Sequence, residues 1–202
     1  MTTNNFHNDV INSAVAALNG GGTLLYPTDT IWGIGCDATN TAAVEKIYAL
    51  KQRDHSKSML ILCEDIAMVE RFVGRVGEEV AALLLSSGRP TTVIMPSTLD
   101  VLAGNLVAAD GTIGVRIPNM LFCQGLLHAF GRPIVSTSAN LSGQPSPKCY
   151  SDIGAELLCR VDYCVPSSLE VPTDGKGSRI LKLVHDEDSS GTNTAHISVI
   201  RP

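Results

Sequence analysis

Aromatic residues, charged residues and long apolar runs are all scarce in this sequence of 202 residues. Only 4% of the residues are aromatic and the net charge is −5, which excludes a basic field over the whole surface that would attract nucleic acid, although a local basic pocket stays open. No apolar run approaches the ~20 residues that a membrane-spanning helix needs, and the first residues, MTTNNFHNDV, lack the charged and apolar regions of a signal peptide. We therefore expect a cytoplasmic protein without a membrane partner.

Metal-binding and nucleophile motifs are also missing. The six cysteines form no CxxC pair and mostly stand in apolar contexts such as LILCED, which favours reduced structural thiols over disulfides. The five histidines show no HxxxH spacing, so we predict no metal site built from protein ligands. Because GxSxG, GxxxxGK[ST] and GxGxxG are absent, any chemistry should rely on positioning and electrostatics.

Helical and strand periodicities alternate along the chain. Helical spacing predicts helices within residues 8–22, 42–51, 66–73, 77–86, 120–131 and 152–161, and strands are predicted within 23–27, 58–64, 91–96, 112–118, 133–140, 162–166, 177–184 and 196–202. Since some connections are short enough for hairpins, we predict a single α/β domain over residues 1–202, with a twisted mixed sheet flanked by helices. The polar run at 186–195 is predicted to be a flexible loop.

The stretch LLYPTDTIWGIG, residues 24–35, begins as a buried strand and then changes character. Pro27 should end the strand, because proline cannot donate a ladder hydrogen bond. Two threonines and an aspartate follow directly, and glycines at 33 and 35 allow another backbone to pack closely. Hydroxyls and a carboxylate at the mouth of a strand are typical of a ligand site.

The stretch LKQRDHSK, residues 50–57, places Lys51 and Arg53 two positions apart. If the preceding helix stops near Leu50, the two side chains share one face of an extended segment and can converge on one anion, with Lys57 as a third cation. A guanidinium and an ammonium together suit phosphate oxygens. The alternative is a solvated basic helix end, which the helix dipole also favours.

The stretch PIVSTSANLSG, residues 133–143, carries Ser136, Ser138 and Asn140 at alternate positions. Strand geometry would place Ser138 and Asn140 on one face, towards a cavity, and Thr137 on the other. The alternative is a strand end that continues into a turn, since serine, asparagine and glycine are also turn residues.

Arg116 interrupts the apolar strand TIGVRIP. A charge inside a buried strand is costly unless it is paired, so Arg116 should meet a carboxylate, either that of Asp29 or one belonging to a ligand. The alternative is an edge strand with Arg116 in water. A weaker indication is Thr92, a hydroxyl at the start of the strand TTVIMP.

Together these segments resemble the YrdC-type threonylcarbamoyl-AMP synthase family. The likeness runs from GGTLLYPTDTIWGIGCDA through AVEKIYALKQR, TTVIMP and TIGVRIP to PIVSTSANLSG, nearly the whole chain. Its most specific elements are a KxR pair, here Lys51 and Arg53, and an SxN pair, here Ser138 and Asn140. The chain resembles the single-domain form, without the extra C-terminal domain of the longer synthases.

The resemblance implies an α/β fold around a deep, positively lined cavity, and a nucleotidyltransferase that uses ATP. Such enzymes make threonylcarbamoyl-AMP and pyrophosphate from L-threonine, bicarbonate and ATP, with Mg²⁺ carried by the ATP phosphates, for the t6A modification of tRNA. The carbamate must be adenylated away from water, and the resemblance implies that a downstream transferase complex takes the product. With so acidic a chain, we expect weak or no direct tRNA binding.

The resemblance also implies the site residues. Lys51 and Arg53 would be catalytic. Threonine would be bound by Thr28, Arg116 and Ser178, and the nucleotide by Lys51, Arg53, Thr92, Ser138 and Asn140.

Some positions depart from the family pattern: Trp32 stands where tyrosine is usual, Asp54 where proline is common, and Arg179 where threonine is frequent.

Two alternative functions stay open, an RNA-binding module and a divergent protein of this fold without synthase activity. A carbamoyl-transfer module of the hydrogenase-maturation type shares the fold, but the chain lacks zinc-finger and acylphosphatase-like segments.

Overall fold

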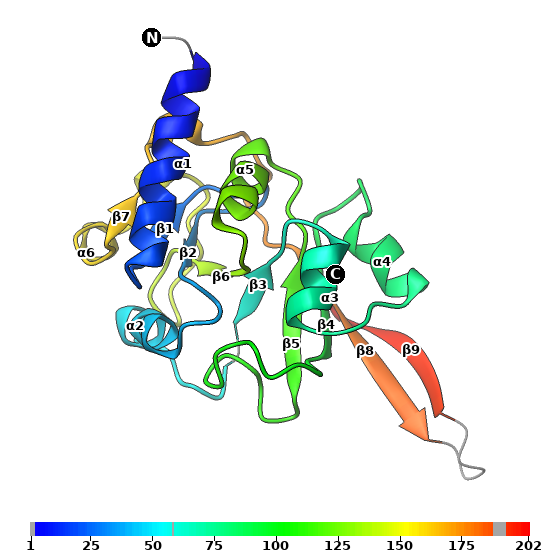
Figure 1. The fold of residues 1–202 in the computed structure, drawn as a ribbon. Coiled ribbons are helices and arrows are strands. Elements are labelled where there is room, and N and C mark those ends of the chain that lie inside the picture. The colour runs from blue at the N-terminus through cyan, green and yellow to red at the C-terminus, as the bar shows by residue number, and fades with distance from the viewer. Residues whose placement is uncertain (1–2, 58, 188–192) are drawn as a thin grey trace.

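The described part of the chain forms a mixed nine-stranded sheet in the order β7-β1-β2-β6-β3-β5-β4-β8-β9, with helices around it (Figure 1). A computed structural model describes residues 3–57, 59–187 and 193–202. The helices are α1 (Thr3–Asn19), α2 (Thr41–Lys51), α3 (Ile66–Phe72), α4 (Glu78–Leu84), α5 (Leu121–Phe130) and α6 (Ala155–Leu158). The strands are β1 (Leu24–Tyr26), β2 (Gly33–Gly35), β3 (Leu60–Leu62), β4 (Thr91–Pro96), β5 (Thr112–Arg116), β6 (Ile134–Ser138), β7 (Tyr163–Cys164), β8 (Arg179–Glu187) and β9 (Asn193–Arg201). The predicted α/β fold class with a mixed sheet is confirmed.

Helix α2 leads directly into the KxR segment. The Asn40 side chain caps its N-terminus by accepting a hydrogen bond from the backbone N–H of Ala43 at 3.1 Å. The helix ends at Lys51, one residue later than the sequence suggested, because Gln52 takes a left-handed conformation with φ of 49°. Lys51 is therefore the last helical residue, and Arg53 lies beyond the turn.

Three strands at one end of the sheet bring distant residues into one row. Strand β4 pairs in parallel with β8, with Thr92 opposite Ile180, and β8 pairs antiparallel with β9, with Ile180 opposite Arg201. Side chains in such a row point to the same face of a sheet. The hairpin of β8 and β9 extends away from the rest of the sheet (Figure 1).

A flexible loop was predicted at 186–195. Strand β8 continues to Glu187 and β9 begins at Asn193, and residues 188–192 lie outside the described residues. None of the helices in the described ranges is long and apolar enough to cross a membrane.

Gly35 packs directly against strand β6, as the glycine pattern predicted. A Cβ atom at this position would lie 2.2 Å from the carbonyl oxygen of Val135 and 2.9 Å from the Tyr26 ring. Strands β1, β2 and β6 can therefore approach one another only without a side chain at position 35.

Candidate functional site

A cavity of about 320 Å³ is lined by residues from β2, β3, β4, β5, β6, β8 and β9 and from the segments between them. Its lining is rich in hydroxyls and arginines, and comprises Thr28, Thr30, Ile31, Trp32, Gly33, Arg53, Met59, Leu60, Thr92, Ile94, Gly114, Arg116, Ser136, Thr137, Ser138, Ser146, Gly177, Ser178, Ile180 and Arg201. This volume lies in the range of small-molecule sites. No aspartate or glutamate contributes to the lining as far as the structure describes the chain.

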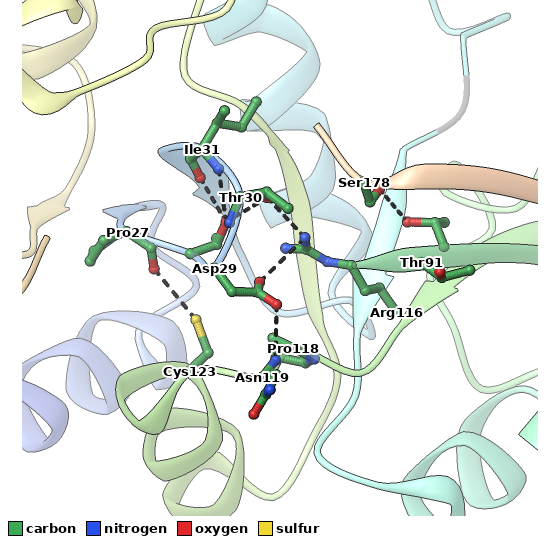
Figure 2. Close-up of polar contacts among 12 residues, drawn as sticks. Pro27, Asp29, Thr30, Ile31, Thr91, Arg116, Pro118, Asn119, Cys123 and Ser178 are labelled. Atoms are coloured by element: carbon green, nitrogen blue, oxygen red, sulfur yellow. Dashed lines mark hydrogen bonds and ion pairs between the residues drawn. The ribbon is translucent and has the colours of Figure 1, made fainter. Parts of the chain in front are cut away.

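Arg116 contributes to the cavity lining, and its side chain is 3% exposed. Its Nη1 donates to Thr30 Oγ1 at 2.8 Å and lies 3.4 Å from Asp29 Oδ1 (Figure 2). Asp29 is held in turn by the backbone N–H of Asn119, which donates to its Oδ2 at 3.0 Å. The predicted pairing of Arg116 with Asp29 is confirmed, and the guanidinium has a fixed orientation.

The polar residues that follow Pro27 fold into a compact turn. Thr28 Oγ1 lies 2.8 Å from Thr30 Oγ1 and donates to the carbonyl oxygen of Ile31 at 2.7 Å. Thr28 and Thr30 are 3% and 5% exposed, so both hydroxyls are held inside the protein at the cavity wall. The stretch predicted to form a ligand site therefore contributes to the cavity lining, directly after β1.

A second wall of the cavity is formed where β4 contacts the segment before β8. Thr92 Oγ1 and Ser178 Oγ are 2.7 Å apart, and both residues are buried. Arg201, on β9, donates from Nε and Nη2 to the carbonyl oxygen of Ser178 at 2.9 and 2.6 Å. Partial burial of the Arg201 guanidinium, together with the charges of Arg89 and Arg116, lowers its pKa.

Arg53 contributes the third guanidinium of the lining. Its Nε donates to the carbonyl oxygen of Lys57 at 2.8 Å, which closes the loop that follows α2. Asp54, which stands where the family often has proline, accepts from the backbone N–H of Ser56 at 2.8 Å and stabilises the same loop. Burial of the Arg53 side chain lowers its pKa.

Lys51 does not line the cavity, unlike its KxR partner. The side chain is 1% exposed, and Nζ donates to the carbonyl oxygens of Ser138 and Asn140. Burial, and secondarily the charge of Arg53, lowers the pKa of Lys51 to about 8. Neither a shared cavity face with Arg53 nor a solvated helix end describes Lys51 correctly.

The SxN segment divides in the same way. Ser136, Thr137 and Ser138 all contribute to the cavity lining, and strand pairing places Ser138 opposite Gly33, another lining residue, and Thr137 opposite Ile34, which is not one. Strand β6 ends at Ser138, and Asn140 lies beyond it in a turn, where Nδ2 donates to the carbonyl oxygen of Gln144 at 2.6 Å. Asn140 does not line the cavity, because period-two alternation stops where the strand stops.

Sequence reasoning missed Arg201 and Ser146 in the lining. Arg201 could have been found, because VIRP places one arginine in an apolar strand just as VRIP does at Arg116. Ser146 lies in an irregular segment and gave no signal.

Trp32 is fixed at the cavity wall by a contact that the sequence did not indicate. Its Nε1 donates to Glu170 Oε1 at 2.7 Å, and the same oxygen accepts from the backbone N–H of Tyr150 at 2.9 Å. The rings of Trp32 and Tyr150 are 5.0 Å apart.

Within the described ranges, no group of three or more histidine, cysteine, aspartate and glutamate side chains is placed to hold a metal ion. The arrangement of the lining suits a ligand with several negative charges, because three guanidinium groups from α2's loop, β5 and β9 face one space.

Comparison with known proteins identifies relatives over most of the chain. The family model for Sua5, YciO and YrdC proteins, described as "Telomere recombination", matches residues 16–190. A threonylcarbamoyl-AMP synthase from Chromohalobacter salexigens is 36% identical over 181 residues, which are 85% of this chain and 97% of the relative. A protein of the same name from Xanthomonas campestris is 30% identical over 186 residues, 89% of this chain and 99% of the relative.

Solved structures share the fold. Sua5 from P. abyssi in complex with L-threonine superposes with a TM-score of 0.77 at 24% identity, covering 86% of this chain and 50% of that one. YciO from E. coli superposes with a TM-score of 0.73 at 26% identity, covering 96% and 88%. Full-length HypF has the same fold over 27% of its chain, with a TM-score of 0.75 and 24% identity.

Proposed function

The chain belongs to the Sua5/YciO/YrdC family, and from this membership we propose that it is an L-threonylcarbamoyladenylate synthase. Its relatives named threonylcarbamoyl-AMP synthase are 30–36% identical over most of the chain. The observation that carries the proposal is the composition of the cavity lining. Arg53, Arg116 and Arg201 all belong to this lining, and none of the described residues that form it is an aspartate or a glutamate. Triphosphate and carbamate together form the dense anion that such a lining fits.

The proposed reaction has two steps. The amine of L-threonine attacks bicarbonate to give a carbamate, with loss of water. A carbamate oxygen then attacks the α-phosphorus of ATP, the bond from that phosphorus to the bridging oxygen breaks, and pyrophosphate leaves. Mg²⁺ enters as part of the ATP substrate.

Arg116 is proposed to bind the threonine carboxylate. Its Nη1 is oriented by Thr30 and Asp29, while its Nε is buried without a hydrogen-bond partner in the described part of the chain. A buried donor without a partner is costly, and a carboxylate would satisfy it. The paired hydroxyls of Thr28 and Thr30 lie beside this guanidinium, where they can accept or donate to the threonine side chain and amine.

Arg53, Arg201, Thr92 and Ser138 are proposed to hold the nucleotide. In the transition state negative charge grows on the oxygens of the leaving pyrophosphate, and guanidinium groups fixed in advance stabilise that charge. Ser178 links β4 to β9 within this wall, since its hydroxyl pairs with Thr92 and its carbonyl oxygen with Arg201. We further propose that tRNA binds only weakly and that the adenylate passes to a separate transferase.

The decisive assay measures pyrophosphate release from ATP with and without L-threonine and bicarbonate. We expect release only when all three substrates are present, and isotopically labelled threonine should appear in a mixed anhydride of its carbamate with AMP. Arg116→Met should raise KM for threonine more than KM for ATP, whereas Arg75→Met, an exposed arginine outside the lining, should change neither. If ATP binds but no threonine-dependent pyrophosphate is released, the chain is a family member without synthase activity.

A further inference from the structure

Lys51 and Asn140 connect the two family motifs through contacts that lie outside the cavity lining. The Lys51 ammonium has three N–H donors, and the structure gives each an acceptor: the carbonyl oxygen of Ser138, that of Asn140 at 2.6 Å, and Asn140 Oδ1 at 3.4 Å. Among the described residues no carboxylate pairs with this ammonium. A phosphate oxygen could reach Lys51 only by displacing one of these acceptors.

The turn after β6 also donates a hydrogen bond back to the end of α2. The backbone N–H of Ser142 donates to the carbonyl oxygen of Lys51 at 3.0 Å. Asn140 uses the rest of its amide within the turn, since Nδ2 donates to the carbonyl oxygens of Gln144 and Leu141 at 2.6 and 3.1 Å. The end of α2 and the turn after β6 are thus joined by side-chain and backbone bonds.

We propose that Lys51 and Asn140 are positioning residues, which together form a buried clasp that fixes Ser138 and Arg53 at the cavity wall. Each motif then supplies one residue that faces the ligand, Arg53 or Ser138, and one that holds the wall in place, Lys51 or Asn140. The proposal rests on the proposed function only in identifying the ligand as a nucleotide. The clasp itself consists of contacts within the chain.

The left-handed Gln52 explains why the two cations separate. Its backbone N–H donates back to the helix, and Arg53 N–H donates to the carbonyl oxygen of Tyr48 at 3.0 Å, so the chain reverses between Lys51 and Arg53. The Lys51 side chain therefore contacts the turn after β6, whereas Arg53 contributes to the cavity lining. Neutral carbonyl acceptors, in place of a carboxylate, leave the positive charge of Lys51 uncompensated within the wall, where it adds to the field of the three lining arginines.

The experiment measures hydrogen exchange at the backbone amides of residues 139–146 in the wild-type chain, Lys51→Met and Asn140→Ala. We expect exchange about tenfold faster in both variants, because the turn loses bonds to a charged group. Lys46→Met is the matched control, since Lys46 lies on the same helix and donates to the carbonyl oxygen of Gly21 instead. Arg53→Met should leave exchange at 139–146 unchanged.

Binding of ATP and of AMP, measured by calorimetry on the same variants, supplies a readout that a loss of stability alone would not move. A positioning role predicts that Lys51→Met and Asn140→Ala both weaken nucleotide binding, by about tenfold, because either change releases the wall that carries Arg53 and Ser138. Unchanged exchange in Lys51→Met, or nucleotide affinity that is lost in Lys51→Met but kept in Asn140→Ala, would overturn the clasp. Should Lys51→Met fail to fold, exchange in Asn140→Ala decides alone. If the wild-type chain binds neither nucleotide, the proposed function fails while the exchange data still decide on the clasp.

Discussion

Arg116 and Asp29 form an ion pair with an Nη1 to Oδ1 distance of 3.4 Å, and their side chains are 3% and 11% exposed. The pair joins the end of strand β5 to the turn after β1. A buried charge without a counter-charge is costly, so loss of Asp29 should destabilise the fold more than loss of a residue from an exposed ion pair.

We expect Asp29→Asn to lower the free energy of unfolding by about 3 kcal/mol, because Arg116 would remain buried without a counter-charge. Urea unfolding monitored by circular dichroism measures this change. Glu156→Gln is the matched control, since Glu156 pairs with Arg160 at 3.5 Å but is 56% exposed, and exposed pairs contribute at most about 1 kcal/mol. Equal losses in the two variants would contradict a special role for the buried pair.

Gly35→Ala should destabilise the fold by about 2 kcal/mol or more, because the new Cβ would lie 2.2 Å from the backbone oxygen of Val135. A backbone oxygen within a sheet cannot move aside without breaking the pairing of β2 with β6. Gly104→Ala, where no atom lies within 4 Å of the added Cβ, should leave the unfolding midpoint nearly unchanged. A midpoint for Gly35→Ala close to that of Gly104→Ala would show that the sheet can relax.

The sequence was informative where one local rule decides the outcome. Pro27 ends β1 because it lacks an N–H, and Arg116 finds Asp29 because a buried guanidinium needs a counter-charge. Alternation along β6 placed Ser138 at the cavity correctly. The need for a strand end at Pro27 and for a counter-charge at Arg116 follows from the residue type and its apolar context, and Asp29 was a candidate partner because it lies in another segment with site character.

The sequence failed where the deciding partner lies far along the chain. The acceptors of Lys51 come from the turn after β6, and nothing near Lys51 indicates them. Asn140 was extrapolated from the period of a strand that has already ended at Ser138. Arg201 enters the cavity only because β8 lies between β4 and β9, and strand order cannot be derived from periodicity.

Trp32, the sole tryptophan of the chain, should report on the cavity through its fluorescence. We expect saturable changes in emission as ATP is added.

Glu170→Ala should shift the emission of Trp32 to longer wavelength and lower the free energy of unfolding by about 1–2 kcal/mol, because the indole N–H loses its acceptor at 2.7 Å. Glu156→Ala, at an exposed glutamate paired with Arg160, is the control and should change neither. Emission unaffected by loss of Glu170 would contradict the contact.

Arg201→Met should weaken ATP binding by about tenfold, since a hydrogen bond to a charged group contributes about 1.5–3 kcal/mol. The Arg201 guanidinium already donates to Ser178, so its position is set before the ligand arrives. Binding by the wild-type chain should weaken as salt rises, and the variant should show a smaller dependence on salt. Calorimetric titrations at low and high salt test this, and parallel salt dependences would contradict direct contact between Arg201 and ATP.

Lys51 should give the folded protein two opposite responses to alkaline pH. Its pKa is lowered from 10.5 to about 8 by burial and by the charge of Arg53, so between these values the folded chain holds a neutral amine and the unfolded chain an ammonium. Because the unfolded state then binds more protons, the contribution of Lys51 to the free energy of unfolding rises with pH through this window.

Nucleotide binding should respond in the other direction. A neutral amine has two N–H donors and a lone pair, so it cannot satisfy three oxygen acceptors and would loosen its contacts with Ser138 and Asn140. AMP is a suitable ligand because none of its own groups titrates in the window. We expect the affinity of the wild-type chain for AMP to fall between pH 7.5 and 9.5, values chosen on either side of the lowered pKa, while that of Lys51→Met stays constant. Parallel pH profiles of the two proteins would show that the charge of Lys51 does not hold the cavity wall.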